Sequence, residues 1–220
     1  MEEPHSTNTN TNTKSKSTGQ PDQLVDKQPP YEEGPAYRNT LPSRAVRKIS
    51  LRSKGSGRGH FLMDLPDLDH TIRVNVESGL EKNTGHVLAA DPALIDLREQ
   101  AFTFQYVDAW GHKRNHTIDF LATYAGGFKV AFVVKNTKDA RSQKFRDNFK
   151  RIEAGMPRQL ADDVILVTNQ SFTRTQIRNA AKLHHFRMFP DPEADEILAA
   201  ALKRLSKPVT ILELGRLTGL

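Results

Sequence analysis

The chain has 220 residues, a formal net charge of +6, 37% hydrophobic residues and 26% charged residues, which fits one globular domain with polar appendages. It contains no cysteine, so disulfide cross-links and cysteine-ligated zinc are excluded. No apolar run approaches the ~18–20 residues that span a bilayer, and the N-terminus lacks the apolar core of a signal peptide, so we expect a cytoplasmic protein without a membrane partner.

The first part of the chain divides into a polar tail and a basic arm. Residues 1–37 include a run of alternating Asn and Thr, which predicts disorder because such a segment buries too little surface to offset its ordering entropy. Residues 38–69 form a Gly- and Arg-rich arm. No acidic residue lies between Gly34 and Met63, and a block of one charge attracts a polyanion. The candidate DNA-binding residues here are Arg52, Lys54 and Arg58; a flexible, solvated linker is the alternative.

Ordered patterning begins near His70, and we expect the main domain to span residues 70–190. Residues 71–76 alternate polar and apolar side chains, which predicts a half-buried strand. Residues 78–90 place apolar side chains on one helical face. Ser78 is the expected N-cap of this helix, and Glu81 follows it at the spacing of a capping box.

A strand-rich region follows. Turn signals at residues 108–111 (DAWG) and 126–127 (GG) separate strand-like patterns. We predict strands at residues 93–97, 101–107, 114–124 and 128–134. The last of these strands are joined by short connections, so we expect them to form an antiparallel meander.

The remaining patterns are helical apart from one buried strand. Helices are predicted at residues 139–156, 173–185 and 193–205, and a strand at residues 163–168. This order predicts an α/β fold with a mixed sheet flanked by helices. Residues 191–220 are expected to be C-terminal helices. Their last segment, from Pro208, looks like the first helix of a helix-turn-helix; alternatively, its apolar stripe docks on a partner.

An acid and a lysine in apolar strands are the first candidates for chemistry. Asp119 lies within the predicted strand 114–124, and Lys135 follows an apolar run. If the two strands pair, alternation brings both residues near the same edge and face of the sheet. The carboxylate could hold Mg²⁺, and the lysine could stabilise charge on a phosphate oxygen. A partly buried ion pair without catalytic function is the alternative.

Several segments resemble TnsA-type transposon endonucleases. They occur in the family's order at residues 55–60, 78–81, 94–100, 116–121 and 133–135, within a region of resemblance from Lys54 to Phe189. The resemblance implies a restriction-endonuclease-like fold of the PD-(D/E)xK type, with an antiparallel meander in a mixed sheet. It also implies Mg²⁺ as cofactor, with Mn²⁺ as a possible substitute.

The resemblance also implies roles for individual residues. Glu81 would be the helix carboxylate, Asp119 the central metal ligand and Lys135 the catalytic lysine. Glu77 is a second candidate for the helix acid. The metal ligands would be Asp119, Glu81 and the backbone carbonyl of Val134. Val133 stands where the family has Glu or Gln, and this change could weaken metal binding or abolish cutting while leaving DNA binding.

Further basic residues are candidates for contact with double-stranded DNA. Lys113 and Arg114 follow the predicted turn, beside His112 and His116, which could contact DNA, relay protons or simply be solvated. Arg174 and Arg178 lie on the predicted helix 173–185, which ends in His184 and His185. These cations either contact phosphate or complement the helix dipole.

The resemblance implies a function within a larger machinery. In this family, TnsA cuts the 5′ ends of the element, while a partner transposase cuts and joins the 3′ ends and an ATPase regulates the reaction. A catalytically inactive DNA-binding or bridging protein is one alternative. A free-standing defence or repair nuclease is another.

Overall fold

The structure is a computed structural model that describes residues 40–47, 57–65 and 70–220. The predicted tail at residues 1–37 and the candidate DNA-binding residues Arg52 and Lys54 lie outside the described residues. No helix in these described ranges is both long and apolar enough to cross a membrane.

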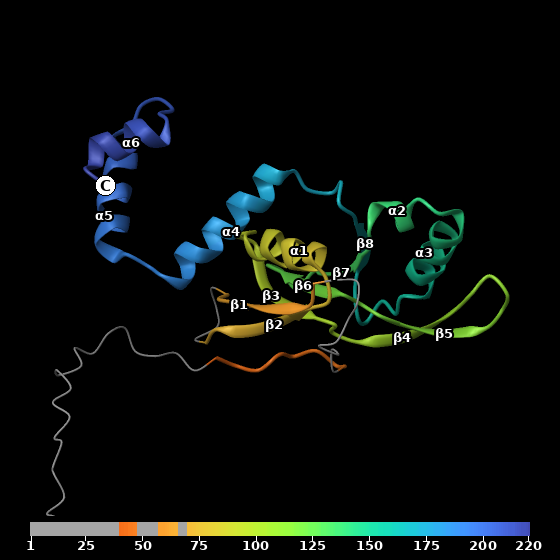
Figure 1. The fold of residues 1–220 in the computed structure, drawn as a ribbon. Coiled ribbons are helices and arrows are strands. Elements are labelled where there is room, and N and C mark those ends of the chain that lie inside the picture. The colour runs from red at the N-terminus through yellow and green to blue at the C-terminus, as the bar shows by residue number, and fades with distance from the viewer. Residues whose placement is uncertain (1–39, 48–56, 66–69) are drawn as a thin grey trace, which may run out of the picture. The chain divides into compact units, whose positions relative to one another are not determined.

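Strands and helices follow one another in the order shown in Figure 1. The strands are β1 (Gly59–Met63), β2 (Ile72–Val76), β3 (Leu94–Glu99), β4 (Thr103–Val107), β5 (Lys113–Thr117), β6 (Phe120–Tyr124), β7 (Lys129–Val134) and β8 (Asp163–Val167). The helices are α1 (Gly79–Ala89), α2 (Thr137–Ala140), α3 (Gln143–Gly155), α4 (Arg174–Met188), α5 (Pro192–Arg204) and α6 (Ile211–Thr218).

A four-stranded sheet in the order β3-β6-β7-β8 forms the centre of the fold. Strands β3, β6 and β7 pair antiparallel, and β8 joins β7 in parallel. The parallel pairing requires a crossover, which α2 and α3 supply between the two strands. The predicted α/β class with a mixed sheet flanked by helices is confirmed, and it is compatible with a restriction-endonuclease-like fold.

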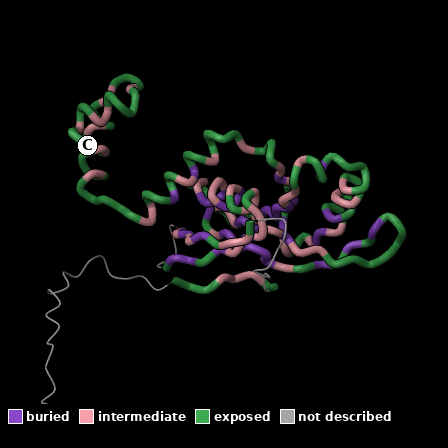
Figure 2. Tube along the Cα trace, viewed as in Figure 1, coloured by how far each residue is buried: buried purple, intermediate pink, exposed green. Residues whose placement is uncertain are grey.

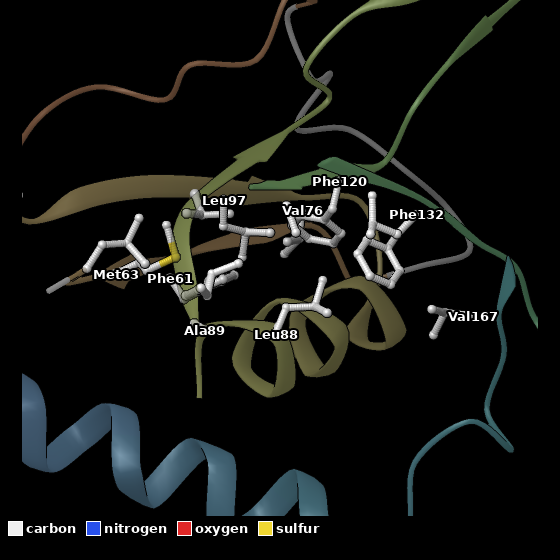
Figure 3. Packing of buried hydrophobic residues seen from close by; sticks show 14 residues of the cluster. Phe61, Met63, Val76, Leu88, Ala89, Leu97, Phe120, Phe132 and Val167 are labelled. Atoms are coloured by element: carbon white, nitrogen blue, oxygen red, sulfur yellow. The ribbon is translucent and has the colours of Figure 1, made fainter. Parts of the chain in front are cut away.

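Two hydrophobic clusters line the opposite faces of this sheet. The first cluster contains Phe120, Phe132 and the α1 residue Leu88; Figure 3 shows these side chains between the strands and the helix. The second cluster includes Val133 and the α3 residue Ile152. Along β7 the side chains alternate between the clusters as the sequence pattern predicts.

The predicted long strand at residues 114–124 is wrong. The strand is interrupted at Ile118 and Asp119. As a result, β5 pairs with β4 in a separate two-stranded ribbon, while β6 pairs within the central sheet. The Ile118 N–H donates to the Phe102 carbonyl at 3.1 Å instead of to the central sheet. The predicted single meander is therefore divided, and β3, rather than a meander strand, covers the outer side of β6.

Part of the predicted basic arm is an integral strand. β1 pairs antiparallel with β2, and its alternate side chains Phe61 and Met63 are buried in the first cluster. Leu41 also exchanges backbone hydrogen bonds with Thr71 and Arg73 on either side of Ile72. Paired backbone therefore begins before His70, which the sequence does not indicate because basic and glycine residues around β1 hide its short apolar alternation.

Most predicted helices are present, with two local differences. Ser78 caps α1 as predicted. The Glu81 carboxylate, however, accepts hydrogen bonds from the Glu77 N–H and the Ser78 hydroxyl, whereas a capping box would use the Ser78 N–H. The predicted helix at residues 139–156 is interrupted, since Ser142 caps a new helix, α3, behind the short α2.

The C-terminal helices α5 and α6 are present where the sequence predicts them. All of their residues are described, and none of them is buried (Figure 2). Ile211 is 90% exposed. The helix-turn-helix and partner-docking interpretations of this segment both remain predictions.

Candidate active site

Asp119 lies where the chain leaves the central sheet. Its Oδ2 accepts a hydrogen bond of 2.7 Å from the Val134 N–H of β7, and its own carbonyl accepts one of 2.8 Å from the Gln100 N–H. In an unbroken antiparallel ladder, main-chain groups of the neighbouring strand would pair with Val134. Because the main chain turns away at Ile118, the Asp119 side chain serves as the acceptor. The break in the strand thereby fixes the carboxylate at the end of the sheet.

Glu81 supplies a second carboxylate, and its charge affects the pKa of Asp119. Burial raises the pKa of Glu81, while hydrogen bonds from the Glu77 N–H and the Ser78 hydroxyl oppose this shift. Burial likewise raises the pKa of Asp119 to about 7, opposed by the Val134 N–H and reinforced by the charges of Glu81 and Glu77. The carboxylates of Glu81 and Glu77 therefore disfavour the ionised form of Asp119.

Arg47 partly balances this negative charge. Its guanidinium forms an ion pair with Glu77, and its positive charge lowers the pKa values of both Glu81 and Asp119. Glu77, the second candidate for the helix acid, is thus paired, whereas Glu81 is held by capping hydrogen bonds. Within the described residues, no group of three or more His, Cys, Asp or Glu side chains is arranged so that it could hold a metal ion.

Lys135 lies at the same end of the sheet, but its ammonium group has other partners. It directly follows Val134, and its N–H donates to the Val167 carbonyl at 2.9 Å. The Nζ atom lies 3.9 Å from an Asp139 carboxylate oxygen and 5.9 Å from the centroid of the Phe145 ring. Among the residues that the structure describes, Lys135 and Asp119 form no ion pair. The Lys135 charge therefore faces α2 and α3.

Val133 lies inside the second hydrophobic cluster. Its side chain is 2% exposed and shares this cluster with Ile152 and Val164. A valine has no side-chain oxygen to offer a metal, and the surroundings are apolar. The position that carries Glu or Gln in the resembling family is thus part of the core here.

The predicted DNA-binding residues that the structure describes lie on or beside three different elements. Lys113 and Arg114 lie on β5 of the ribbon, and the Arg114 Nε donates to Asp108 at 2.9 Å. Arg174 and Arg178 are exposed on α4, which packs against α1 and lies apart from the ribbon (Figure 1). Arg58 directly precedes β1, and its position in the sequence is far from both of these pairs.

A cleft between the ribbon and the α2–α3 segment was not predicted from the sequence. Its volume is about 930 Å³, and Lys135 is one of its lining residues. Trp110 lines it from the turn of the ribbon, and Lys138 and Lys144 line it from α2 and α3. The sequence pattern predicted a helix at residues 139–156, but its basic residues gave no indication that they face a cleft.

Comparison with known proteins supports the resemblance over the central part of the chain. Residues 91–159 match the family model described as "TnsA-like endonuclease N terminal". The matched range contains Asp119 and Lys135 but not Glu81. No curated protein gives a significant match to the chain.

Proposed function

From the premise that this chain carries a TnsA-like endonuclease domain, we propose that it is a Mg²⁺-dependent endonuclease that cuts double-stranded DNA at the 5′ ends of a transposable element. It would act with a partner transposase and an ATPase regulator. The observation that carries the proposal is the buried Asp119 carboxylate inside the matched segment, which accepts a hydrogen bond from the Val134 N–H and whose pKa the charge of Glu81 raises.

The chemistry of the proposed donors would suit a magnesium ion. Mg²⁺ in proteins is commonly held by one or two carboxylates and keeps several waters. Asp119 and Glu81 supply carboxylates whose raised pKa values reflect uncompensated burial, a cost that a divalent cation relieves. The N–H and C=O of one strand residue point to the same side. The Val134 carbonyl therefore faces the side on which its N–H meets Asp119, which supports its proposed role as a ligand.

Residues of the chain would have separate roles at the scissile phosphate. A bound Mg²⁺ would polarise a phosphate oxygen and acidify a water. The Asp119 carboxylate is already oriented by Val134, and Glu81 is oriented by the N-cap, so neither needs large rearrangement. Water attacks the phosphorus in line, and the bond to the 3′ oxygen breaks. The products are a 5′-phosphate and a 3′-hydroxyl, which takes up a proton.

Lys135 would stabilise the charge that grows on the phosphate. Its side chain is 42% exposed, and its contact with Asp139 at 3.9 Å is a surface ion pair of low stability. Turning the ammonium group from Asp139 toward a bound phosphate therefore costs little. DNA phosphate would compete directly with the Asp139 carboxylate for this lysine.

One observation favours a second candidate, a nuclease-fold protein that binds DNA without cutting it. Val133 supplies no metal ligand and is surrounded by apolar side chains. The remaining donors would then have to hold the cation alone.

Strand cleavage with matched variants tests the proposal. Purified protein is incubated with element-end duplex, the partner transposase and Mg²⁺ or Mn²⁺. We expect 5′-end cutting, and a loss of roughly 100-fold or more in Asp119→Ala and Lys135→Ala. Lys203→Ala, an exposed change on α5, serves as control and should cut normally. Binding without strand breaks under every condition would instead support the inactive DNA-binding protein.

A further inference from the structure

We propose that the cleft between the β4–β5 ribbon and the α2–α3 segment binds an unpaired DNA base beside the scissile phosphate, with the indole ring of Trp110 stacked on that base. The inference rests on the proposed function, because it concerns the DNA that reaches Lys135. It adds a nucleotide-binding subsite that none of the carboxylate residues forms.

The cleft joins the candidate catalytic lysine to an aromatic and basic surface. Its volume of about 930 Å³ is at the upper end of the range typical of small-molecule pockets. The lining residues on which the inference rests are Trp110, Arg114, Lys135, Lys138 and Lys144. A nucleotide bound here would lie next to any phosphate that Lys135 contacts.

A hydrogen-bonded turn holds Trp110 in a solvent-exposed position. The Asp108 carboxylate accepts hydrogen bonds from the Trp110 N–H at 2.9 Å, the His112 N–H at 3.0 Å and the Arg114 guanidinium at 2.9 Å. Gly111 has a φ of 81°, which suits a glycine at this tight turn. The indole nevertheless remains 67% exposed. The fold thus presents a large flat apolar ring to solvent instead of burying it.

Three carboxylates of the cleft each have a neighbouring donor. Asp108 binds Arg114 and Asp139 faces Lys135, whereas Asp147 accepts a hydrogen bond of 2.8 Å from the neutral Gln143 amide. Lys138 and Lys144 are exposed at the same cleft, and no ion pair involves either of them in the described part of the chain. Their ammonium groups are therefore suited to bind backbone phosphates on either side of the base.

An aromatic ring among cations is the usual platform for single-stranded nucleic acid, where bases stack on the ring and the cations follow the backbone. In an intact duplex both faces of each interior base are already stacked. Trp110 can therefore stack only on a base that is unpaired or displaced. This argues that the DNA near the cleavage position is locally opened when it occupies the cleft.

Intrinsic fluorescence provides a direct test, because Trp110 is the chain's single tryptophan. The full chain carrying Asp119→Ala is titrated, without metal, with a duplex bearing an unpaired extension and with a fully paired duplex of the same length. We expect the extended duplex to quench the indole emission at least twofold more at saturation. In anisotropy measurements with labelled DNA, Trp110→Ala should weaken binding of the extended duplex roughly tenfold, and Trp110→Phe less.

Lysine variants test the backbone contacts. Lys138→Ala and Lys144→Ala should each weaken binding several-fold and lower the salt dependence by about one counterion, whereas Lys203→Ala should not. Equal quenching by both duplexes, or tight binding without quenching, would overturn the inference. Cutting by the wild type without quenching would leave the proposed function standing and refute this subsite. Quenching without cutting would support the subsite and refute the nuclease.

Discussion

Asp119 illustrates how one side chain can serve both the backbone and a reactive site. Its carboxylate takes the hydrogen bond that a regular strand would give Val134, and its pKa is raised to about 7 by burial and by the charges of Glu81 and Glu77. A group with these properties is costly to ionise without a cation. The residue that ends the ladder is therefore also the one that the proposed metal site would use.

The raised pKa of Asp119 makes the free energy of unfolding depend on pH. The folded protein holds this proton up to a pH near 7, whereas the unfolded chain releases it near pH 4. The folded state thus binds more protons in that window, so the free energy of unfolding should fall as pH rises through it. Each pKa unit corresponds to about 1.4 kcal/mol.

Asp119→Asn should remove most of this slope, since the amide cannot ionise but its oxygen can still accept from Val134. Urea unfolding in EDTA between pH 5 and pH 8 measures the effect, and the variant should be more stable than wild type at pH 8. The raised pKa of Glu81 leaves a residual slope in both proteins. An unchanged slope in the variant would show that Asp119 ionises freely.

Val133→Gln tests whether position 133 belongs to the core or to the site. The amide would enter an apolar cluster, so we expect a loss of about 1–3 kcal/mol in the free energy of unfolding, equal with and without Mg²⁺. Val133→Ala gives the cost of lost packing alone. If Mg²⁺ selectively restored the stability of the glutamine variant, or if cutting increased, position 133 would be a metal-binding position after all.

At the scale of elements, helix α4 is attached to α1 and to β1 through two histidines, His86 and His184. The His86 and His184 rings stack with centroids 5.3 Å apart, and the His184 Nε2 is hydrogen-bonded to the Leu62 carbonyl of β1. Burial lowers the pKa of both rings, and that of His86 falls to about 4. The contact between α1 and α4 therefore depends on neutral histidines.

Acid should weaken this contact. Between pH 6.5 and about 4 the unfolded chain binds protons that the folded His86 does not, so stability is present above this window and is lost as pH falls through it. Hydrogen exchange in α4, corrected for intrinsic rates, should show less protection at pH 5 than at pH 7. His86→Gln should reduce this difference. Equal protection at both pH values would mean that the rings titrate without consequence.

The broken strand shows how pairing between elements overrides local pattern. Ile118 and Phe120 share a face in a continuous strand, yet Ile118 packs in the second cluster and Phe120 in the first. Because of this interruption, β5 pairs with β4 and not with the central sheet. The resulting ribbon forms one wall of the cleft. A single local bend thus determines both the position of Asp119 and the access to Lys135.

At the scale of the whole molecule, the described residues of the two hydrophobic clusters all precede α5. Helices α5 and α6 contribute no buried residue of their own. A chain ending at residue 190 should therefore unfold cooperatively, with a Tm within about 2 °C of the full chain. Differential scanning calorimetry measures both. A drop of more than about 5 °C would show that the C-terminal helices stabilise the domain.

The sequence by itself determined the α/β class, the N-cap of α1, the alternation along β7 and the family resemblance that the match at residues 91–159 supports. These features depend on neighbours along the chain, and local periodicity records them. Only the tertiary structure decided that β1 joins β2, that Asp119 bonds Val134, that Lys135 faces Asp139 and that Trp110 lines a cleft. Periodicity says which side chains need burial, but pairing between distant segments decides which partners they meet.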